Sequence, residues 1–290
     1  MPSASLAAII ASLHGRSGKT LLARALVDYF ILCGGKPYIF DTDAVERGLQ
    51  ALFPAAARVV DLTVVRDQME LFDTLAKPSP QMRVVDLTHH SLTKFFQLLR
   101  NTDFIFEARS HDITPVIFYI PDGKADSFAA GVVLRDNFAD CRFIVVENTF
   151  MKEPKRNVCQ DPAYKALRAH KRRFVMPKLA DSVFAALEDR DLSIADFMRQ
   201  PISPSEETQA PNSLSPDILA ELRAWVFGMF QEIHRVISGL AIDDGPLDDT
   251  TGRPWAADLE NWGPAVNVSG PNNVGRRQMI LNRLLLLGKP

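Results

Sequence analysis

The segment from Ala8 to Thr20, AIIASLHGRSGKT, constrains the fold of this chain more than any other. An uninterrupted apolar run leads into a glycine loop, and the loop leads into an apolar helical pattern, LLARALVDYFILC. A strand, a glycine loop and a helix in this order are typical of a phosphate-binding P-loop. The N–H groups at the helix start converge on an anion, and the helix dipole favours negative charge there.

The predicted phosphate cradle consists of Gly15, Arg16, Ser17, Gly18, Lys19, Thr20 and Leu21. In such a loop Lys19 would reach the β- and γ-phosphates, and the Thr20 hydroxyl would bind Mg²⁺. The usual pattern has a glycine five residues before Gly18, where this chain has Leu13. The alternative is a chance Gly-Lys-Thr at an ordinary strand–helix turn; the apolar segments on both sides favour the P-loop.

Composition narrows the class of protein. The 290 residues are enough for one large α/β domain with appendages or for two small domains, and 47% of them are hydrophobic. The net charge of −2 gives no global reason to expect nucleic-acid binding. Three widely separated cysteines suggest neither a disulfide framework nor a metal cluster, which fits a cytoplasmic protein. The N-terminus lacks the basic segment of a signal peptide, and no apolar run reaches the ~18 residues of a membrane span.

Downstream of the loop, short apolar runs alternate with helical patterns. The expected strands are 37–40, 58–63, 83–88, 116–120, 142–147 and 173–176, and the expected helices are 20–33, 67–76, 91–100 and 128–138. The letters RVVDLT occur at both 58–63 and 83–88, but their flanks differ, which indicates two similar parallel strands and no internal repeat. The pattern predicts an α/β fold, a three-layer P-loop NTPase fold with a central, mostly parallel sheet and a C-terminal helical extension.

Two domains are expected: residues 1–200 as the nucleotide-binding domain, and 201–290 as a linker, an amphipathic helix and a tail. The linker is rich in Pro, Ser, Glu and Asn, and the helical pattern resumes over 216–240. The apolar stripe of this expected helix consists of Leu219, Leu222, Val226, Phe230, Ile233 and Ile237. A short basic, apolar helix is expected over 275–288.

Carboxylates follow two of the predicted strands. Asp41 and Asp43 come at the end of the run 37–40, and Asp86 ends the β-branched part of the second RVVDLT. The carboxyl ends of parallel strands form the edge where such folds bind ligands, so Asp86 is the candidate carboxylate for the Mg²⁺ water. His89 and His90 are expected in a loop near the γ-phosphate and not at a metal, because adjacent side chains of a strand point to opposite faces.

Together, the P-loop, Asp41 and Asp43, Asp86, and the strand ends VVEN and VMP resemble the ParA/MinD family of P-loop ATPases. That family lies in the wider class of dethiobiotin synthetase and nitrogenase iron protein, and the resemblance covers roughly residues 5 to 200. It implies ATP and Mg²⁺ as cofactors, with slow hydrolysis that switches association with a partner. A role in plasmid or chromosome segregation, positioning or conjugative transfer is what the family implies.

The resemblance also implies roles for individual residues. Asp43 would position the attacking water, and Asp41 would lie in the Mg²⁺ and switch network. Asn148 would recognise the adenine amino edge, and Pro177 would contact the base. The GTP-specific Asn-Lys-x-Asp pattern is absent from the sequence, which favours ATP.

The loop departs from the family signature, lysine-glycine-glycine-any-glycine-lysine-threonine. His14 stands where that signature has its first lysine, and Arg16 stands at its second glycine. In the family the first lysine reaches the partner's phosphates across a nucleotide-sandwiched dimer. A neutral imidazole lacks this charge, whereas Arg16 offers a forked cation as a catalytic group. Either Arg16 crosses to a partner in a nucleotide-dependent homodimer, or neither residue does and dimer-coupled hydrolysis is lost.

Two other segments are candidates for binding a partner, one for DNA and one for a membrane surface. The basic run over 165–173 consists of Lys165, Arg168, His170, Lys171, Arg172 and Arg173. It is either a non-specific DNA-binding patch, as in segregation proteins of the family, or a solvated helix face. The segment 275–288 is either a membrane-surface helix, as at the C-terminus of MinD, or a helix packed on protein.

Two other functions remain open beside the switch. One is a small-molecule kinase or ATP-dependent ligase of the same fold, as in dethiobiotin synthetase. Its substrate pocket would be built from the loops after Asp86 and Pro121. The other is a nucleotide-binding scaffold that has lost hydrolysis.

Overall fold

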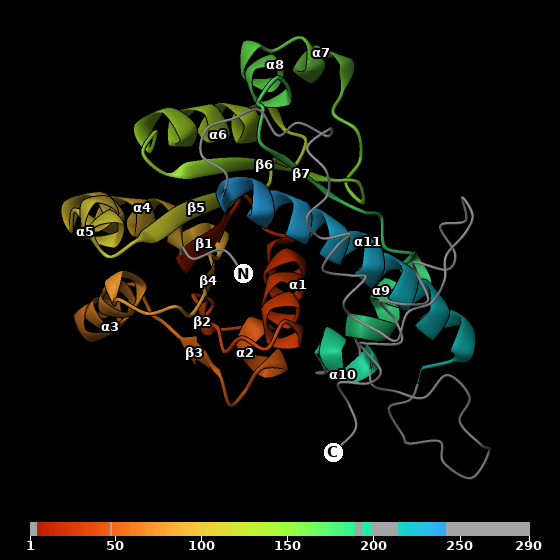
Figure 1. The fold of residues 1–290 in the computed structure, drawn as a ribbon. Helices are drawn as coiled ribbons and strands as arrows, with labels where there is room; N and C mark the ends of the chain where they lie inside the picture. Colours follow the sequence, from red (N-terminus) through yellow and green to blue (C-terminus); the bar gives the residue numbers. More distant parts are fainter. Residues whose placement is uncertain (1–4, 47, 189–192, 199–213, 242–290) are drawn as a thin grey trace.

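A computed structural model describes residues 5–46, 48–188, 193–198 and 214–241. Its centre is a seven-stranded sheet with the order β3-β2-β4-β1-β5-β6-β7 (Figure 1). Every pair of neighbouring strands is parallel. The strands are β1 (Ser5–Ala11), β2 (Tyr38–Asp41), β3 (Ala57–Val59), β4 (Arg83–Asp86), β5 (Ile113–Tyr119), β6 (Arg142–Asn148) and β7 (Arg173–Met176). The predicted α/β class is confirmed, and the sheet is wholly parallel.

Helices cover both faces of this sheet. The described helices are α1 (Lys19–Leu32), α2 (Gly48–Leu52), α3 (Val65–Ala76), the 3₁₀ helix η1 (His89–Ser91), α4 (Leu92–Asn101), α5 (Phe104–Ser110), α6 (Ala125–Asn137), α7 (Arg156–Cys159), α8 (Pro162–Arg168), α9 (Asp181–Glu188), α10 (Ile194–Met198) and α11 (Pro216–Ala241). The sequence patterns predicted α1, α3, α4, α6 and α11. They missed the short helices, which contain too few turns to establish a period.

Two hydrophobic clusters form the core, one on each face of the sheet. Alternate residues of β1 supply both of them: Leu6, Ala8 and Ile10 face one cluster, and Ala7, Ile9 and Ala11 face the other. The first cluster joins the sheet to α1 and α11, which lie side by side in Figure 1. The second joins it to α3, α4 and α5 and to residues of α6 and α8. Burial on both faces explains why the strands are continuous apolar runs.

The amphipathic stripe predicted in α11 is buried. Its residues Leu219, Leu222, Val226, Phe230, Ile233 and Ile237 all belong to the cluster on the α1 face. This helix is therefore part of the same core as the P-loop helix. The segment 201–213 and the segment 275–288, with its possible membrane helix, lie outside the described residues.

The two RVVDLT segments fold differently. The prediction of a strand over 58–63 is wrong for its second half, since β3 ends at Val59 and Asp61 accepts hydrogen bonds from the N–H and hydroxyl of Thr63. An aspartate side chain that binds the backbone two residues ahead forms a turn and competes with strand pairing. The second copy is a strand as far as Asp86, because β4 lies between β1 and β2.

We expect Gly131→Ala to destabilise the protein by about 1–3 kcal/mol, although alanine favours a helix by about 1 kcal/mol. A Cβ atom at Gly131 of α6 would lie 2.6 Å from Cε1 of Tyr119 and 2.7 Å from Cδ1 of Leu167. Urea denaturation measures the change. Gly228→Ala in α11 is the control, because its nearest neighbour would be Pro177 Cγ at 3.8 Å. Equal stability of the two variants would contradict this packing account.

Candidate functional site

The loop between β1 and α1 has the backbone geometry of an anion cradle. Gly18 is the N-cap of α1 with φ +94°, and Arg16 has φ +58°, so both lie in the left-handed region. Residues in this region turn successive N–H groups towards a common point. Gly15 and Arg16 are exposed, and Ser17 is buried with no hydrogen-bond partner for its hydroxyl among the described residues. The loop therefore presents its backbone and a buried hydroxyl at the start of a long helix.

Lys19 is folded back onto the loop. Its Nζ donates a hydrogen bond of 3.0 Å to the carbonyl oxygen of His14. Burial lowers the pKa of Lys19, and the charges of Asp86, Asp122 and Asp43 act in the opposite direction. A buried ammonium group with one backbone acceptor retains donors for a further anionic ligand.

Asp86 and Thr20 form the polar centre beside Lys19. The Thr20 hydroxyl donates a hydrogen bond of 2.7 Å to Oδ2 of Asp86, whereas Oδ1 is buried and has no hydrogen-bond partner among the described residues. Burial raises the pKa of Asp86 to about 7, and the bond from Thr20 partly offsets the increase. A hydroxyl beside a buried carboxylate with a spare oxygen fits a hard cation such as Mg²⁺. Two of the three residues predicted at the metal, Thr20 and Asp86, are thus in direct contact although they lie in distant segments.

Asp41 lies next to Asp86 in strand register but uses its oxygens differently. They accept backbone N–H bonds from Asp43 at 2.9 Å, Leu49 at 2.8 Å and Gln50 at 3.1 Å. Burial raises the pKa of Asp41, and these backbone bonds lower it. Its carboxylate holds the loop after β2 and the start of α2 in place.

Asp43, the predicted water-positioning residue, lies in that loop. Its Oδ1 accepts the N–H groups of Val45 at 3.0 Å and Glu46 at 2.8 Å, which closes a turn. The side chain of Val45 in the same turn is 90% exposed. Asp43 is therefore carried by a surface turn close enough to Lys19 for its charge to affect the lysine's pKa.

His14, at the position of the family's first lysine, is engaged within its own chain. Its Nδ1 lies 2.7 Å from Oδ2 of Asp122, and its Nε2 lies 3.4 Å from Oδ2 of Asp126. Both aspartates follow β5, in the segment after Pro121, and neither was predicted as a site residue. The available signal was the Asp122-Gly123 turn, which directly follows an apolar run and so marks the same sheet edge. Arg16 differs, because it is exposed and has no hydrogen bond or ion pair in the part of the chain that the structure describes.

The expectation that His89 and His90 point in opposite directions, as neighbours in a strand do, is wrong. The chain leaves β4 at Asp86 and forms η1, so the two rings lie together with their centroids 3.8 Å apart. The pKa of His89 is lowered, mainly by burial and to a smaller extent by the charge of the nearby His90. A Cβ atom on Gly15 would lie 3.5 Å from the His89 ring, which places this histidine beside the P-loop. No group of three or more histidine, cysteine, aspartate or glutamate residues within the described ranges could hold a metal ion.

The ends of β6 and β7 approach the P-loop from the side opposite to Asp86, because they lie on the other side of β1 from β4. The Asn148 side-chain amide donates a hydrogen bond of 2.9 Å to the Ser17 carbonyl, and its Oδ1 accepts the N–H of Phe150. Pro177 directly follows β7. Of the two residues that the resemblance assigns to the base, Asn148 therefore contacts the P-loop, and Pro177 follows the neighbouring strand.

Gly18→Ala should weaken anion binding by the loop. A Cβ atom there would lie 2.7 Å from Nδ2 of Asn148 and 2.9 Å from Cε of Met176, and alanine disfavours φ +94°. We expect tripolyphosphate affinity, measured by calorimetry, to fall at least about tenfold. Gly34→Ala, also at positive φ but with open space around it, is the control for backbone strain alone. An equal loss of affinity in both variants would disprove a local effect at the cradle.

The basic run 165–173 is partly neutralised within the chain. Arg168 and Arg173 both pair with Glu147 of β6. His170 Nε2 lies 2.8 Å from the Phe143 carbonyl oxygen. The run continues from α8 through a turn into β7, so it is not a single helix face.

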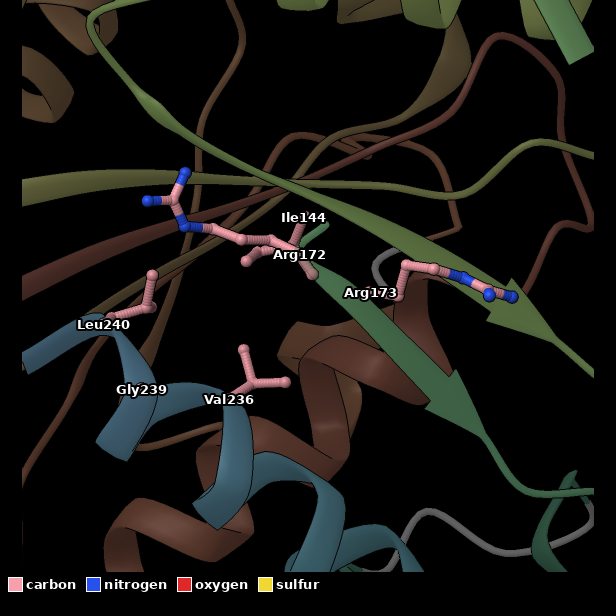
Figure 2. Close-up of a pocket in the computed structure, with 6 residues that line it drawn as sticks. All are labelled: Ile144, Arg172, Arg173, Val236, Gly239 and Leu240. Carbon is pink, nitrogen blue, oxygen red and sulfur yellow. The ribbon is translucent and has the colours of Figure 1, made fainter. Parts of the chain in front are cut away.

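A cavity of about 10 Å³ lies between β6, β7 and α11. Figure 2 shows the residues that line it, Ile144, Arg172, Arg173, Val236, Gly239 and Leu240. This volume holds about one water molecule. The side chains of Arg172 and Arg173 extend away from each other in Figure 2, as neighbours in an extended chain do. Arg173 begins β7, so the cavity lies at the other end of the strands from the P-loop and is too small for a substrate.

The fold and the site together define a three-layer α/β protein whose glycine loop, lysine and buried aspartate converge at the carboxyl ends of central strands. The chain matches no protein-family model, and none of the curated proteins searched matches it. Within the described ranges, no helix is both long and apolar enough to cross a bilayer. The three cysteines are free.

Proposed function

We propose that this chain is a Mg²⁺-dependent ATP-binding protein that hydrolyses ATP slowly and uses the nucleotide as a switch for association with a partner. The observation that carries the proposal is the contact between Thr20 and the buried Asp86, whose second oxygen has no hydrogen-bond partner among the described residues. A buried carboxylate left in this state is costly unless a ligand uses it.

The chain's own groups supply each requirement of phosphate binding. The N–H groups at the start of α1 bind phosphate oxygens, and Lys19 exchanges its bond to the His14 carbonyl for a bond to phosphate. Thr20 and Asp86 would hold Mg²⁺, which supplies charge neutralisation at the phosphates when bound. Asp43 orients the attacking water from its surface turn. Asn148 and Pro177 face the base, with ATP preferred.

The resemblance to ParA/MinD proteins suggests segregation, positioning or conjugative transfer as the process. Arg16, which is exposed and has no ion pair with any residue that the structure describes, is the candidate cation for a nucleotide-dependent homodimer. A second candidate function, phosphoryl transfer to a small molecule within one chain, is favoured by the placement of His14 against Asp122 and Asp126.

The test combines ATP and ADP binding in Mg²⁺, ATP turnover and oligomeric state on the same samples. The switch predicts binding, slow turnover and ATP-dependent dimerisation, and Arg16→Ala should then prevent the dimer. Turnover by a monomer that increases with an added metabolite would support the transferase. Binding of ATP without turnover would support the nucleotide-binding scaffold that has lost hydrolysis. Absence of ATP binding would overturn the proposal.

A further inference from the structure

The outer edge of β7 is bound by side chains of α11. The carbonyl oxygens of Arg172 and Met176 accept bonds from residues of β6 and its following loop, so these residues face into the sheet. Backbone groups alternate sides along a strand. Those of residues 173, 175 and 177 therefore point away from the sheet, where an edge strand would otherwise lack partners.

Two of these groups are satisfied by one ion pair of α11. Arg235 donates a hydrogen bond of 2.6 Å to the Arg173 carbonyl, and the N–H of Val175 donates one of 2.8 Å to Oε1 of Glu232. Arg235 and Glu232 are also bonded to each other at 2.6 Å. The pair thus offers a donor and an acceptor to the edge, as a neighbouring strand would.

Trp225, on the same face of α11, binds the next outward group. Its Nε1 donates a hydrogen bond of 2.9 Å to the carbonyl oxygen of Pro177, and its side chain is buried. Gly228 lies one turn further along, and a Cβ atom there would be in ordinary van der Waals contact with Pro177, 3.8 Å from its Cγ, so this turn of the helix faces the proline. The position of Pro177 is therefore set by α11.

The strand order indicates which part of a nucleotide would reach Pro177. Asp86 lies on β4, on one side of β1, and marks the metal end of the phosphate chain. β6 and β7 lie on the other side of β1, and Met176 and Asn148 approach Gly18 from there. The base, at the far end of the nucleotide from the metal, is thus expected at the ends of β6 and β7.

We infer that α11 builds one wall of the base site, and that Trp225 is a positioning residue for base recognition acting through Pro177. This inference rests on the proposed binding of ATP. It assigns α11 the role of fixing the loop after β7, so that the affinity for the base depends on a helix about fifty residues further along the chain.

Calorimetry with two probes, ATP and inorganic tripolyphosphate, both with Mg²⁺, tests the inference on the full chain. Trp225→Phe removes the N–H donor and keeps an aromatic ring. We expect it to weaken ATP binding about tenfold, the usual effect of losing a buried hydrogen bond, and to leave tripolyphosphate affinity unchanged. Tyr29→Phe is the matched control, because it removes another bond of α11, the 2.8 Å contact between Tyr29 and His234, without touching β7.

A fall in ATP affinity without a fall in tripolyphosphate affinity, seen in Trp225→Phe and absent in Tyr29→Phe, supports the inference. Equal weakening of both probes, or the same ATP-to-tripolyphosphate ratio in both variants, overturns it while the P-loop assignment stands. If wild type binds neither probe, the proposed function fails and the inference fails with it. If Trp225→Phe folds poorly, Glu232→Gln replaces it, because this change weakens the hydrogen bond from the N–H of Val175. It must then lower the ratio of ATP affinity to tripolyphosphate affinity as well.

Discussion

Replacing Lys19 with alanine is expected to reduce ATP affinity by at least about a hundredfold, because a charge-assisted bond to phosphate is lost in a buried site. The stability of the folded state should not decrease. Lys19 is buried, and desolvation outweighs the charges of Asp86, Asp122 and Asp43 in setting its lowered pKa. Removing this costly charge therefore offsets the loss of the bond to the His14 carbonyl. Calorimetry with ATP and Mg²⁺ gives the affinity, and thermal denaturation gives the stability.

Lys94→Ala is the matched control, since Lys94 is an exposed lysine of α4. It should bind ATP as wild type does. If Lys19→Ala retained wild-type affinity, the loop after β1 would not be a nucleotide site, and the proposed function would be abandoned.

Asp86→Asn is expected to have opposite effects on function and stability. Loss of the carboxylate should reduce Mg²⁺-dependent ATP turnover by about a hundredfold or more, because the charge that holds the cation is gone. At the same time the nucleotide-free protein should gain about 1–3 kcal/mol at pH 8, because a buried ionised group is replaced by a neutral amide.

The sign of the pH dependence follows from the pKa. Burial raises the pKa of Asp86 from 3.8 to about 7, so between these values the native state holds a proton that the unfolded state has lost. Wild-type stability therefore falls as the pH rises through this window, and the penalty is complete above pH 7. Asp86→Asn removes the penalty, so its advantage over wild type should be small near pH 4 and greatest at pH 8.

Thermal denaturation at pH 4.5 and pH 8 measures this difference, with the exposed Asp73→Asn of α3 as the control. A variant with the same stability difference at both pH values would show that Asp86 does not titrate as its burial implies. Retention of Mg²⁺-dependent turnover would remove Asp86 from the metal site.

The sequence predicted most of the strands and the long helices because their patterns are local. A strand buried on both faces is a continuous apolar run, and α11 repeats its apolar residues with the helical period. The contacts that complete the candidate site are not local. His14 meets Asp122, and Trp225 meets Pro177, across distances in sequence that no spacing rule covers.

The β1–loop–α1 unit was determined by the sequence itself, because an apolar run, glycines that permit positive φ and a helical pattern follow one another without a break. The two RVVDLT segments show what only the tertiary structure decided. Asp61 lies beyond edge strand β3, where bonds from Thr63 lower its pKa. Asp86 ends central strand β4 beside β1, where burial raises its pKa and Thr20 binds it. The same six letters give a turn or a candidate metal ligand, because the strand order decides which aspartate is buried next to the loop.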